Sequence, residues 1–455
     1  MTEALGLTLP AGLRREAAGW SWIAAGALAV AGALALLLVL SRVPATQVLL
    51  PWSWQSFFYT ALVTHVILSF VVWFLAVLGA LAVLPLAGLE TIRLEKLGPA
   101  GLWAGALGTV LLAVPAFLNE GEPCLNNYVP IVVHPLYYLG LALVGLGVAL
   151  PVVRLLANPA AIRGSVGFGV GVSGVLYLIS LLLIAIAWAC LPAGLDLQTF
   201  NERLFWGGGH VLQFVNTALM LTAWVLLAKT AFGEEPVPPA LFKLVMASMV
   251  VFVLPGPAFY VMYDILSLQH RLAFTDLLWY GLTLPPVVVG LGLILLLWRR
   301  RGTITWGAAE LAIGISLAVF LVGGSMGFFL GASDARTPSH YHSAIGGVNL
   351  AFMGLFIAVI LPALGRAVTS RRLVPVTFHF YGWGQMVFSI GMFVAGAAGV
   401  PRKTMGAAAQ GLDSPLKKVA MGVYGLGGAL AVLGGVLFIW LMLTRLTARK
   451  EEDHG

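Results

Sequence analysis

Residues 57–84 read FFYTALVTHVILSFVVWFLAVLGALAVL, an apolar run without Asp, Glu, Lys or Arg. A helix needs about 20 apolar residues to cross the hydrocarbon core of a membrane, so this run predicts a transmembrane helix. Similar runs follow along the whole chain of 455 residues, of which 60% are hydrophobic and 9% charged. Soluble domains carry about 25% charged residues, so the composition excludes a soluble globular protein.

Twelve such runs predict an all-α, polytopic membrane protein in which twelve transmembrane helices form a single domain over residues 1–455. Short loops with charged residues and prolines separate the runs, and no soluble domain is inserted between them. The predicted spans are about 20–40, 57–84, 101–118, 129–153, 167–190, 204–228, 239–265, 274–298, 306–330, 340–364, 375–398 and 419–444.

The 25 lysines and arginines predict the direction in which the bundle crosses the membrane. With the N-terminus inside, 17 of them fall in inner segments and 8 in outer segments. Cytoplasmic loops are enriched in these residues, so we expect both termini in the cytoplasm. Lysines and arginines in the loops are expected for such a topology, and they account for the net charge of +7. The positive charge therefore does not indicate a protein that binds nucleic acid, and we expect membrane lipid around the chain.

Five of the eight histidines fall at one depth in this topology. His65, His210, His340 and His342 lie in the first third of spans that run from outside to inside, and His270 lies just past the outer end of the seventh span. Polar side chains are costly inside a membrane, and imidazole is the commonest metal ligand. A single histidine in a span more often hydrogen-bonds between helices, but five at one level predict a metal-binding layer in the outer half of the membrane.

The spacing of His340 and His342 indicates which kind of metal cofactor these histidines bind. Residues two apart on a helix point about 200° away from each other, so these two imidazoles cannot hold one ion together. They can ligate two planar cofactors on opposite sides of their helix, and haem commonly takes an axial histidine. His65 lies at the depth needed to give one haem two histidines. His210 and His270 then remain for a second metal site on the open side of the other haem.

These residues resemble those of subunit I of the haem–copper oxidase superfamily, which includes cytochrome c oxidases and nitric oxide reductases. The resemblance covers the whole chain and depends on the twelve spans together with four motifs. The motifs are THVILSFVVWF around His65, WGGGHVLQFVNT around His210, the pair Gln269–His270, and HYHSAIGG from His340 to Gly347.

The resemblance implies a role for each histidine of the layer. His65 and His342 would ligate the iron of a low-spin haem, and His340 the iron of a high-spin haem. His210 and His270 would hold the second active-site metal, which is copper in the oxidases and often non-haem iron in the nitric oxide reductases. The resemblance thus implies two haems and one further metal, with His340, His210 and His270 at the catalytic centre.

The chain departs from the family pattern beside this centre. Gln269 stands next to His270 where the family usually has another histidine, so one ligand of the second metal is missing or replaced by an amide oxygen. Most oxygen-reducing members have a tyrosine four residues after the helix-6 histidine, where this chain has Phe214. In C-type oxidases the tyrosine lies about six residues before the histidine pair, and Tyr263 matches that spacing. A seven-residue separation from His270 puts Tyr263 on the same helix face, as a catalytic residue or as an ordinary core tyrosine.

A basic segment, GVPRK at 399–403, resembles the family element that pairs with haem propionates. Arg402 and Lys403 would then neutralise carboxylates at the outer face, and the alternative is a plain solvated loop.

As a whole, the resemblance implies a terminal respiratory oxidoreductase in a bacterial or archaeal plasma membrane, which reduces O2 to water. Conversion of NO to N2O is the alternative, favoured by Gln269 and Phe214, although this chain lacks the helix-6 glutamates typical of nitric oxide reductases. The two separated cysteines can form neither a C-x-x-C-H haem motif nor a dinuclear copper centre, so electrons must come from a subunit with copper or haem c, or from a quinol. A twelve-span transporter remains a distant alternative, which leaves the histidine layer unexplained.

Overall fold

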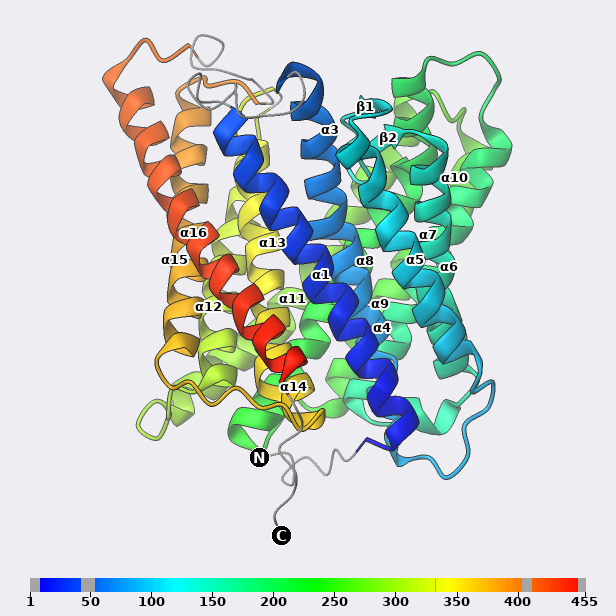
Figure 1. Cartoon of the computed structure of the whole chain (residues 1–455), viewed down its shortest axis with the longest axis vertical. Helices are drawn as coiled ribbons and strands as arrows, with labels where there is room; N and C mark the ends of the chain where they lie inside the picture. Colours follow the sequence, from blue (N-terminus) through cyan, green and yellow to red (C-terminus); the bar gives the residue numbers. More distant parts are fainter. Residues whose placement is uncertain (1–8, 42–53, 332, 403–410, 449–455) are drawn as a thin grey trace. The chain divides into compact units, whose positions relative to one another are not determined.

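The computed structural model describes residues 9–41, 54–331, 333–402 and 411–448 of the chain. Helices make up nearly all of this part (Figure 1), which confirms the predicted all-α class. The strands in these residues are β1 (Glu122–Cys124) and β2 (Ile131–Val133), which pair antiparallel in a loop between two helices.

Eleven helical segments of the described residues are long and apolar enough to cross a membrane, judged by length and composition. The remaining predicted span, 375–398, coincides with a 25-residue helix, α15 (Leu373–Ala397). The predicted count of twelve spans is therefore close to the eleven segments found among the described residues. The eleven segments are Ala11–Leu38, Phe57–Gly88, Leu97–Leu118, Pro135–Leu156, Ser165–Cys190, Leu197–Phe232, Pro239–Met262, Leu268–Arg300, Ala308–Phe329, Arg336–Ala363 and Pro415–Thr447.

The larger of two compact units contains residues 6–225 and 235–292. Its helices pack through glycines, which let backbones approach closely in membranes: a Cβ added at Gly108 would lie 2.7 Å from the carbonyl oxygen of Gly140. The helical elements in or entering this unit are α1 (Ala11–Ser41), α3 (Trp54–Val66), η2 (Ile67–Val72), α4 (Trp73–Leu81), η3 (Leu84–Gly88), α5 (Leu97–Leu118), α6 (Pro135–Leu156), η4 (Pro159–Ile162), α7 (Ser165–Cys190), α8 (Leu197–Phe232), α9 (Pro239–Val253), α10 (Gly256–Met262) and α11 (Leu268–Arg300).

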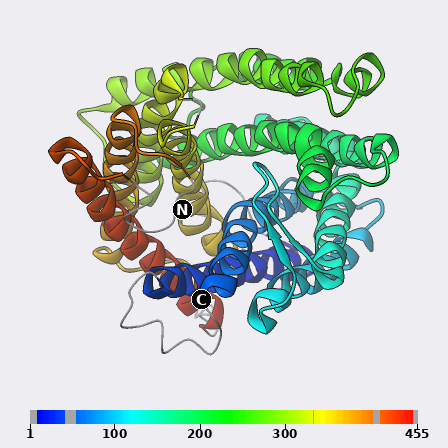
Figure 2. The ribbon, with the colours of Figure 1, turned by 90° about the horizontal axis from the view of Figure 1, so that it is seen from above.

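The smaller unit is formed mainly by residues 293–455, with residues 226–234 from the end of α8. Its α15 and α16 (Pro415–Thr447) pack against each other (orange and red in Figures 1 and 2). Glycines again make the contact, since a Cβ added at Gly384 would overlap the backbone of Ala431. The other helices of this unit are α12 (Ala308–Met326), η5 (Gly327–Phe329), α13 (Arg336–Leu355), η6 (Phe356–Ile360), α14 (Leu361–Ala363) and α16 (Pro415–Thr447).

The seventh and eighth predicted spans, 239–265 and 274–298, differ from the structure at the end where they meet. The seventh is divided into α9 and α10, with Pro255 between them, and it ends at Met262. The eighth, α11, begins earlier than predicted, at Leu268. The hydroxyl of Ser267 accepts the backbone N–H of His270 at 3.1 Å and so caps the start of α11. His270 therefore lies in the first turn of α11.

Candidate functional site

Three successive glycines on α8 make room for side chains beside His210. A Cβ added at Gly209 would overlap the side chain of Tyr128, which lies in the loop between β1 and β2. A Cβ added at Gly207 would overlap the hydroxyl of Tyr260 on α10. The glycines of the motif WGGGH thus allow two aromatic residues, distant in sequence, to reach the helix surface at the histidine.

His210 is 1% exposed, and hydrogen bonds engage both of its ring nitrogens. Its Nδ1 lies 2.6 Å from the carbonyl oxygen of Trp206, one turn earlier on α8. Its Nε2 lies 3.1 Å from the hydroxyl oxygen of Tyr128, and the centroids of these two rings are 4.4 Å apart. The carbonyl can only accept a hydrogen bond, so Nδ1 carries the proton and Nε2 is the nitrogen with a lone pair.

His270 is fully buried, and within the described part of the chain neither of its ring nitrogens has a hydrogen-bond partner. Its ring packs edge-on against Tyr260 and Phe274, with centroids 4.7 Å and 5.2 Å away. The ring of Phe274 also contacts His210, at 5.9 Å. Two buried imidazoles therefore lie against one phenylalanine. A buried polar group without a partner requires an explanation, and a bound metal ion is one that suits imidazole.

Two other predicted residues are less buried than this pair. Gln269 has an exposed side chain. Tyr263 is partly exposed and has an extended backbone, φ −131° and ψ 140°, directly after the last residue of α10. The predicted helix face shared by Tyr263 and His270 is therefore wrong, because a non-helical turn of residues 263–267 lies between α10 and α11. Phe214 is fully buried.

His65 lies in the last turn of α3, two residues before the start of the π-helical segment η2 at Ile67. Its Nδ1 is 2.8 Å from the carbonyl oxygen of Ala31 on α1. That carbonyl fixes the proton on Nδ1 and leaves the lone pair on Nε2, as in histidines that ligate metals. π-helical insertions of this kind frequently occur at functional sites.

In the smaller unit, His340 and His342 face different neighbours, as their spacing predicts. The Nδ1 of His340 lies 2.7 Å from the carbonyl oxygen of Gly323 on α12. The ring of His342 contacts Phe388 of α15 edge-on, with centroids 5.1 Å apart. His340 therefore has the same tautomer as His65, with the lone pair on Nε2.

The predicted propionate-binding segment lies beside the start of α13. The backbone N–H of Arg402 donates to the carbonyl of Ser333 at 3.2 Å, and Pro401 forms a β-bridge with Asp334. Two hydrogen-bonding nitrogens of Arg336 and the nearby charge of Arg402 lower the pKa of the Asp334 carboxyl. Lys403 lies outside the described residues.

No group of three or more His, Cys, Asp or Glu side chains that could hold a metal ion occurs among the described residues. The candidate second-metal site therefore consists of two imidazoles, His210 and His270. Both fit the role by their burial, and His270 fits further by its two unpartnered nitrogens.

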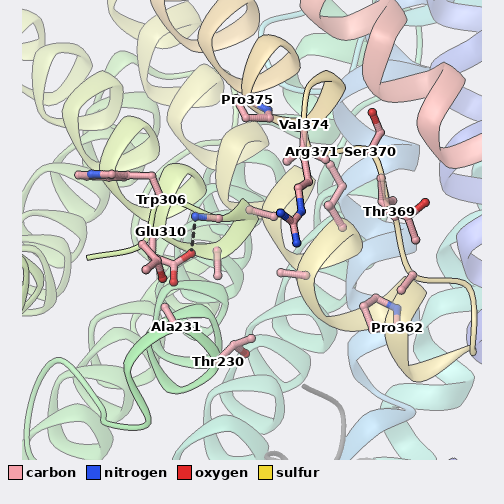
Figure 3. Close-up of a pocket in the computed structure, with 18 residues that line it drawn as sticks. Thr230, Ala231, Trp306, Glu310, Pro362, Thr369, Ser370, Arg371, Val374 and Pro375 are labelled. Atoms are coloured by element: carbon pink, nitrogen blue, oxygen red, sulfur yellow. Dashed lines mark hydrogen bonds between the residues drawn. The ribbon is translucent and has the colours of Figure 1, made fainter. Parts of the chain in front are cut away.

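A pocket of about 590 Å³ in the smaller unit contains none of the predicted ligands (Figure 3). Its lining includes Trp306, Glu310 and Arg371. The carboxylate of Glu310 accepts the backbone N–H of Gly307 at 3.1 Å and thereby caps α12. This pocket is therefore distinct from the histidine sites.

Sequence reasoning missed Tyr128 and Tyr260. Tyr128 precedes His210 by 82 residues and belongs to no motif. The one available signal was the run of three glycines before His210, which indicates that side chains from elsewhere approach the helix closely there.

Comparison with known protein families gives a match over residues 17–430 to the family described as Cytochrome C and Quinol oxidase polypeptide I. The chain belongs to this family. Its relatives include an uncharacterized protein of Rickettsia prowazekii, 23% identical over 92% of this chain and 94% of that protein. An uncharacterized protein of Aquifex aeolicus is 29% identical over 72% of this chain and 80% of that protein.

Cytochrome c oxidase subunit 1 of Thermus thermophilus is 24% identical over 77% of this chain and 69% of that protein. Among solved structures, a heme-copper terminal oxidase dimer matches with a TM-score of 0.72 and 19% identity, over 97% of this chain and 85% of that chain. This likeness shows the fold. As a member of the oxidase polypeptide I family, the chain is an integral, multi-pass membrane protein and a respiratory oxidoreductase of a family that binds haems and a copper or iron centre.

Proposed function

We propose that this chain is the catalytic subunit I of a haem–copper respiratory oxidoreductase that reduces O2 to water. The observation that carries the proposal is the position of His270. It is completely buried, lacks hydrogen-bond partners on both ring nitrogens among the described residues, and contacts the same Phe274 ring as His210. This arrangement supports a second metal held by these two imidazoles.

For the haems, the proposal assigns His65 and His342 to the low-spin iron and His340 to the high-spin iron. The backbone carbonyls of Ala31 and Gly323 support the assignments of His65 and His340, because each fixes the Nδ1 proton of its histidine. The Nε2 lone pair is then free of that proton and oriented by a rigid helix. Arg402 is assigned to haem propionates, and Lys403 with it. The proposal depends on the five histidines and not on Gln269 or Tyr263.

The bound haems and second metal would supply electron transfer and a place where a small gas is reduced. The chain's own residues orient the ligands of that centre and exclude water from it. Trp206 fixes the tautomer of His210, and the aromatic rings of Tyr260 and Phe274 surround the buried His270. Exclusion of water from this cluster strengthens every electrostatic interaction within it.

Reduction of NO to N2O is the second candidate, and two residues favour it. Phe214, where most oxygen-reducing relatives are expected to have a tyrosine, is fully buried and carries no hydroxyl. Gln269 supplies no imidazole and is exposed. The test is to give the purified full-length protein an artificial reductant and record O2 uptake and NO consumption separately. O2 uptake supports the first proposal, NO consumption without O2 uptake supports the second, and the absence of both contradicts each of them.

We further propose that the protein lies in a bacterial or archaeal plasma membrane with both termini in the cytoplasm. The excess of inner lysines and arginines supports this orientation. The electron donor would be a subunit with copper or haem c, or a quinol, because Cys124 and Cys190 are both free and the former is buried. Measuring turnover with reduced cytochrome c and, separately, with a quinol identifies which of the two donates electrons to the protein.

A further inference from the structure

The pocket of about 590 Å³ in the smaller unit is lined by an acid and a base that do not pair with each other. Glu310 comes from the first turn of α12, and Arg371 from the loop between α14 and α15 (Figure 3). Glu310 is 9% exposed, and its carboxylate accepts the N–H of Gly307 but forms no ion pair within the described residues. The guanidinium of Arg371 forms neither a hydrogen bond nor an ion pair with any described residue. The pocket therefore offers two opposite charges to a ligand.

The charges of the pocket favour a ligand that carries both signs. A second guanidinium lies close to the loop of Arg371, since Arg445 on α16 donates to the hydroxyl of Thr369 in the lining at 2.6 Å. A ligand with an anionic group alone would leave the carboxylate of Glu310 without a counter-charge, and a cation alone would leave Arg371 without one. Buried charges are costly unless they are paired. A zwitterion satisfies both sides of the pocket.

The pocket lies at the level where membrane-spanning segments end. The span Ala308–Phe329 begins at its lining, and the span Arg336–Ala363 ends there. Trp306, also in the lining, is 56% exposed, and tryptophan at the end of a span is typical of the interface between membrane and water. Phospholipid headgroups occupy this interface. The zwitterion most accessible to the pocket is therefore a lipid headgroup.

One part of the lining is apolar and suits the hydrocarbon part of such a lipid. It includes Ile357 and Ala358 of the π-helical segment η6, together with Val374 at the start of α15. π-helical segments occur frequently at functional sites. Apolar side chains beside two unpaired charges match a molecule that has a charged head and hydrocarbon chains.

We propose that this pocket binds the headgroup of a phospholipid that carries both a phosphate and a primary ammonium group, as phosphatidylethanolamine does. Arg371 pairs with the phosphate, whose oxygens match the fork of N–H groups on a guanidinium. Glu310 accepts hydrogen bonds from the ammonium group while it continues to cap α12. The site contains none of the predicted haem or metal ligands, so the proposal does not depend on the proposed function.

Two substitutions separate the two halves of the headgroup. Glu310→Gln keeps an oxygen that can accept the N–H of Gly307 and removes the charge that pairs with ammonium. We expect it to lose the preference of the wild type for phosphatidylethanolamine over phosphatidylglycerol, which has a phosphate but no ammonium group. Arg371→Gln removes the partner of the phosphate. We expect its affinity for both lipids to fall about fivefold, the effect typical of one basic residue at a membrane surface.

The matched controls change the same kinds of charge outside the pocket. Arg372→Gln removes the neighbouring exposed arginine of the loop, which does not line the pocket. Glu234→Gln removes a half-exposed acid of the same unit, whose partner Arg300 also lies outside the lining. We expect both controls to bind the two lipids as the wild type does.

The experiment uses the full-length protein, purified in detergent and stripped of lipid, with phosphatidylethanolamine or phosphatidylglycerol added and bound lipid counted by native mass spectrometry. Soluble phosphoethanolamine at the same concentrations tests for a free ligand. We expect it not to bind, because the acyl chains contribute to the binding of a lipid.

The inference is supported if Glu310→Gln abolishes the preference for phosphatidylethanolamine, Arg371→Gln weakens the binding of both lipids, and the controls are unchanged. Equal losses in Arg371→Gln and Arg372→Gln overturn it, because the binding then reflects the general charge of the loop. A preference that Glu310→Gln retains, or no preference in the wild type, also overturns it. Binding of soluble phosphoethanolamine as tight as that of the lipid overturns the assignment to a membrane lipid.

Discussion

Arg154 on α6 forms a bidentate ion pair with Glu16 on α1, across 138 residues of sequence. Its two terminal nitrogens lie 2.9 Å and 2.6 Å from the two carboxylate oxygens. The arginine side chain is fully buried and the glutamate side chain is 8% exposed. Gly98 leaves the space for the guanidinium, because an added Cβ there would overlap it. This pair joins α1 to α6 in the larger unit, and α5 packs against it at Gly98.

Glu16→Gln leaves the buried guanidinium without its counter-charge. Breaking a buried pair by removing one partner destabilises proteins by about 3–5 kcal/mol. We expect a loss of that size, seen as a lower thermal transition in detergent. The control is Glu234→Gln, whose ion pair with Arg300 is 45% exposed on both sides and should contribute about 0–1 kcal/mol. Equal transitions for the two variants would contradict this account of the buried pair.

Gly209→Ala tests whether the loop that carries Tyr128 needs the space beside α8. The added methyl group overlaps the tyrosine side chain, and overpacking of this kind costs about 1–3 kcal/mol. We expect faster hydrogen exchange of the loop amides at residues 125–129. Gly26→Ala on α1 is the matched control, since a Cβ there meets nothing within 4 Å. A loop that exchanges at the wild-type rate in Gly209→Ala would show that the contact is unimportant.

The two cysteines should react very differently with a thiol reagent. Cys190 is exposed, whereas Cys124 is buried. Burial also raises the pKa of the Cys124 thiol, with help from the charges of Glu122 and Asp196, so less of the reactive thiolate is present at neutral pH. We expect a membrane-impermeant maleimide added outside intact cells to label Cys190 and spare Cys124. Labelling of Cys190 only after the cells are opened would contradict the proposed orientation.

The lowered pKa of the Asp334 carboxyl should make the stability of the folded protein depend on pH in the acid range. Arg336 lowers the pKa of this carboxyl below its usual value of 3.8, so the ionised form is favoured in the folded protein. The stabilisation is therefore present above pH 3.8 and is lost as the pH falls through the lower pKa of the folded state. Asp334→Asn should show a smaller drop in thermal stability than the wild type between pH 5 and pH 3. Identical drops would show that the ion pair does not contribute.

The sequence predicted well what depends on local pattern. Uninterrupted apolar runs located the helices, and the helical period predicted that His340 and His342 face different neighbours. The end of α10 was missed, although Asp264 and Ser267 offered the turn and capping signals that accept the N–H groups of Leu266 and His270. Weighing those residues against the apolar run would have ended the seventh span at Met262 and begun the eighth at Leu268.

Contacts between distant segments could not be predicted in the same way. The bond from Tyr128 to His210 depends on a loop position that no periodicity specifies, and on the space that Gly209 leaves. Tyr263 had a suitable spacing, yet spacing on a helix has meaning only where the helix continues. The tyrosine beside the candidate metal site is therefore one that only the folded chain reveals.

The most direct test of the central claim is the absorption spectrum of the purified full-length protein, recorded reduced and oxidised, together with metal analysis. The account predicts two haems and one further metal per chain, with the low-spin signal lost in His65→Ala and the high-spin signal lost in His340→Ala. A colourless preparation, or a haem content that neither substitution changes, would contradict it.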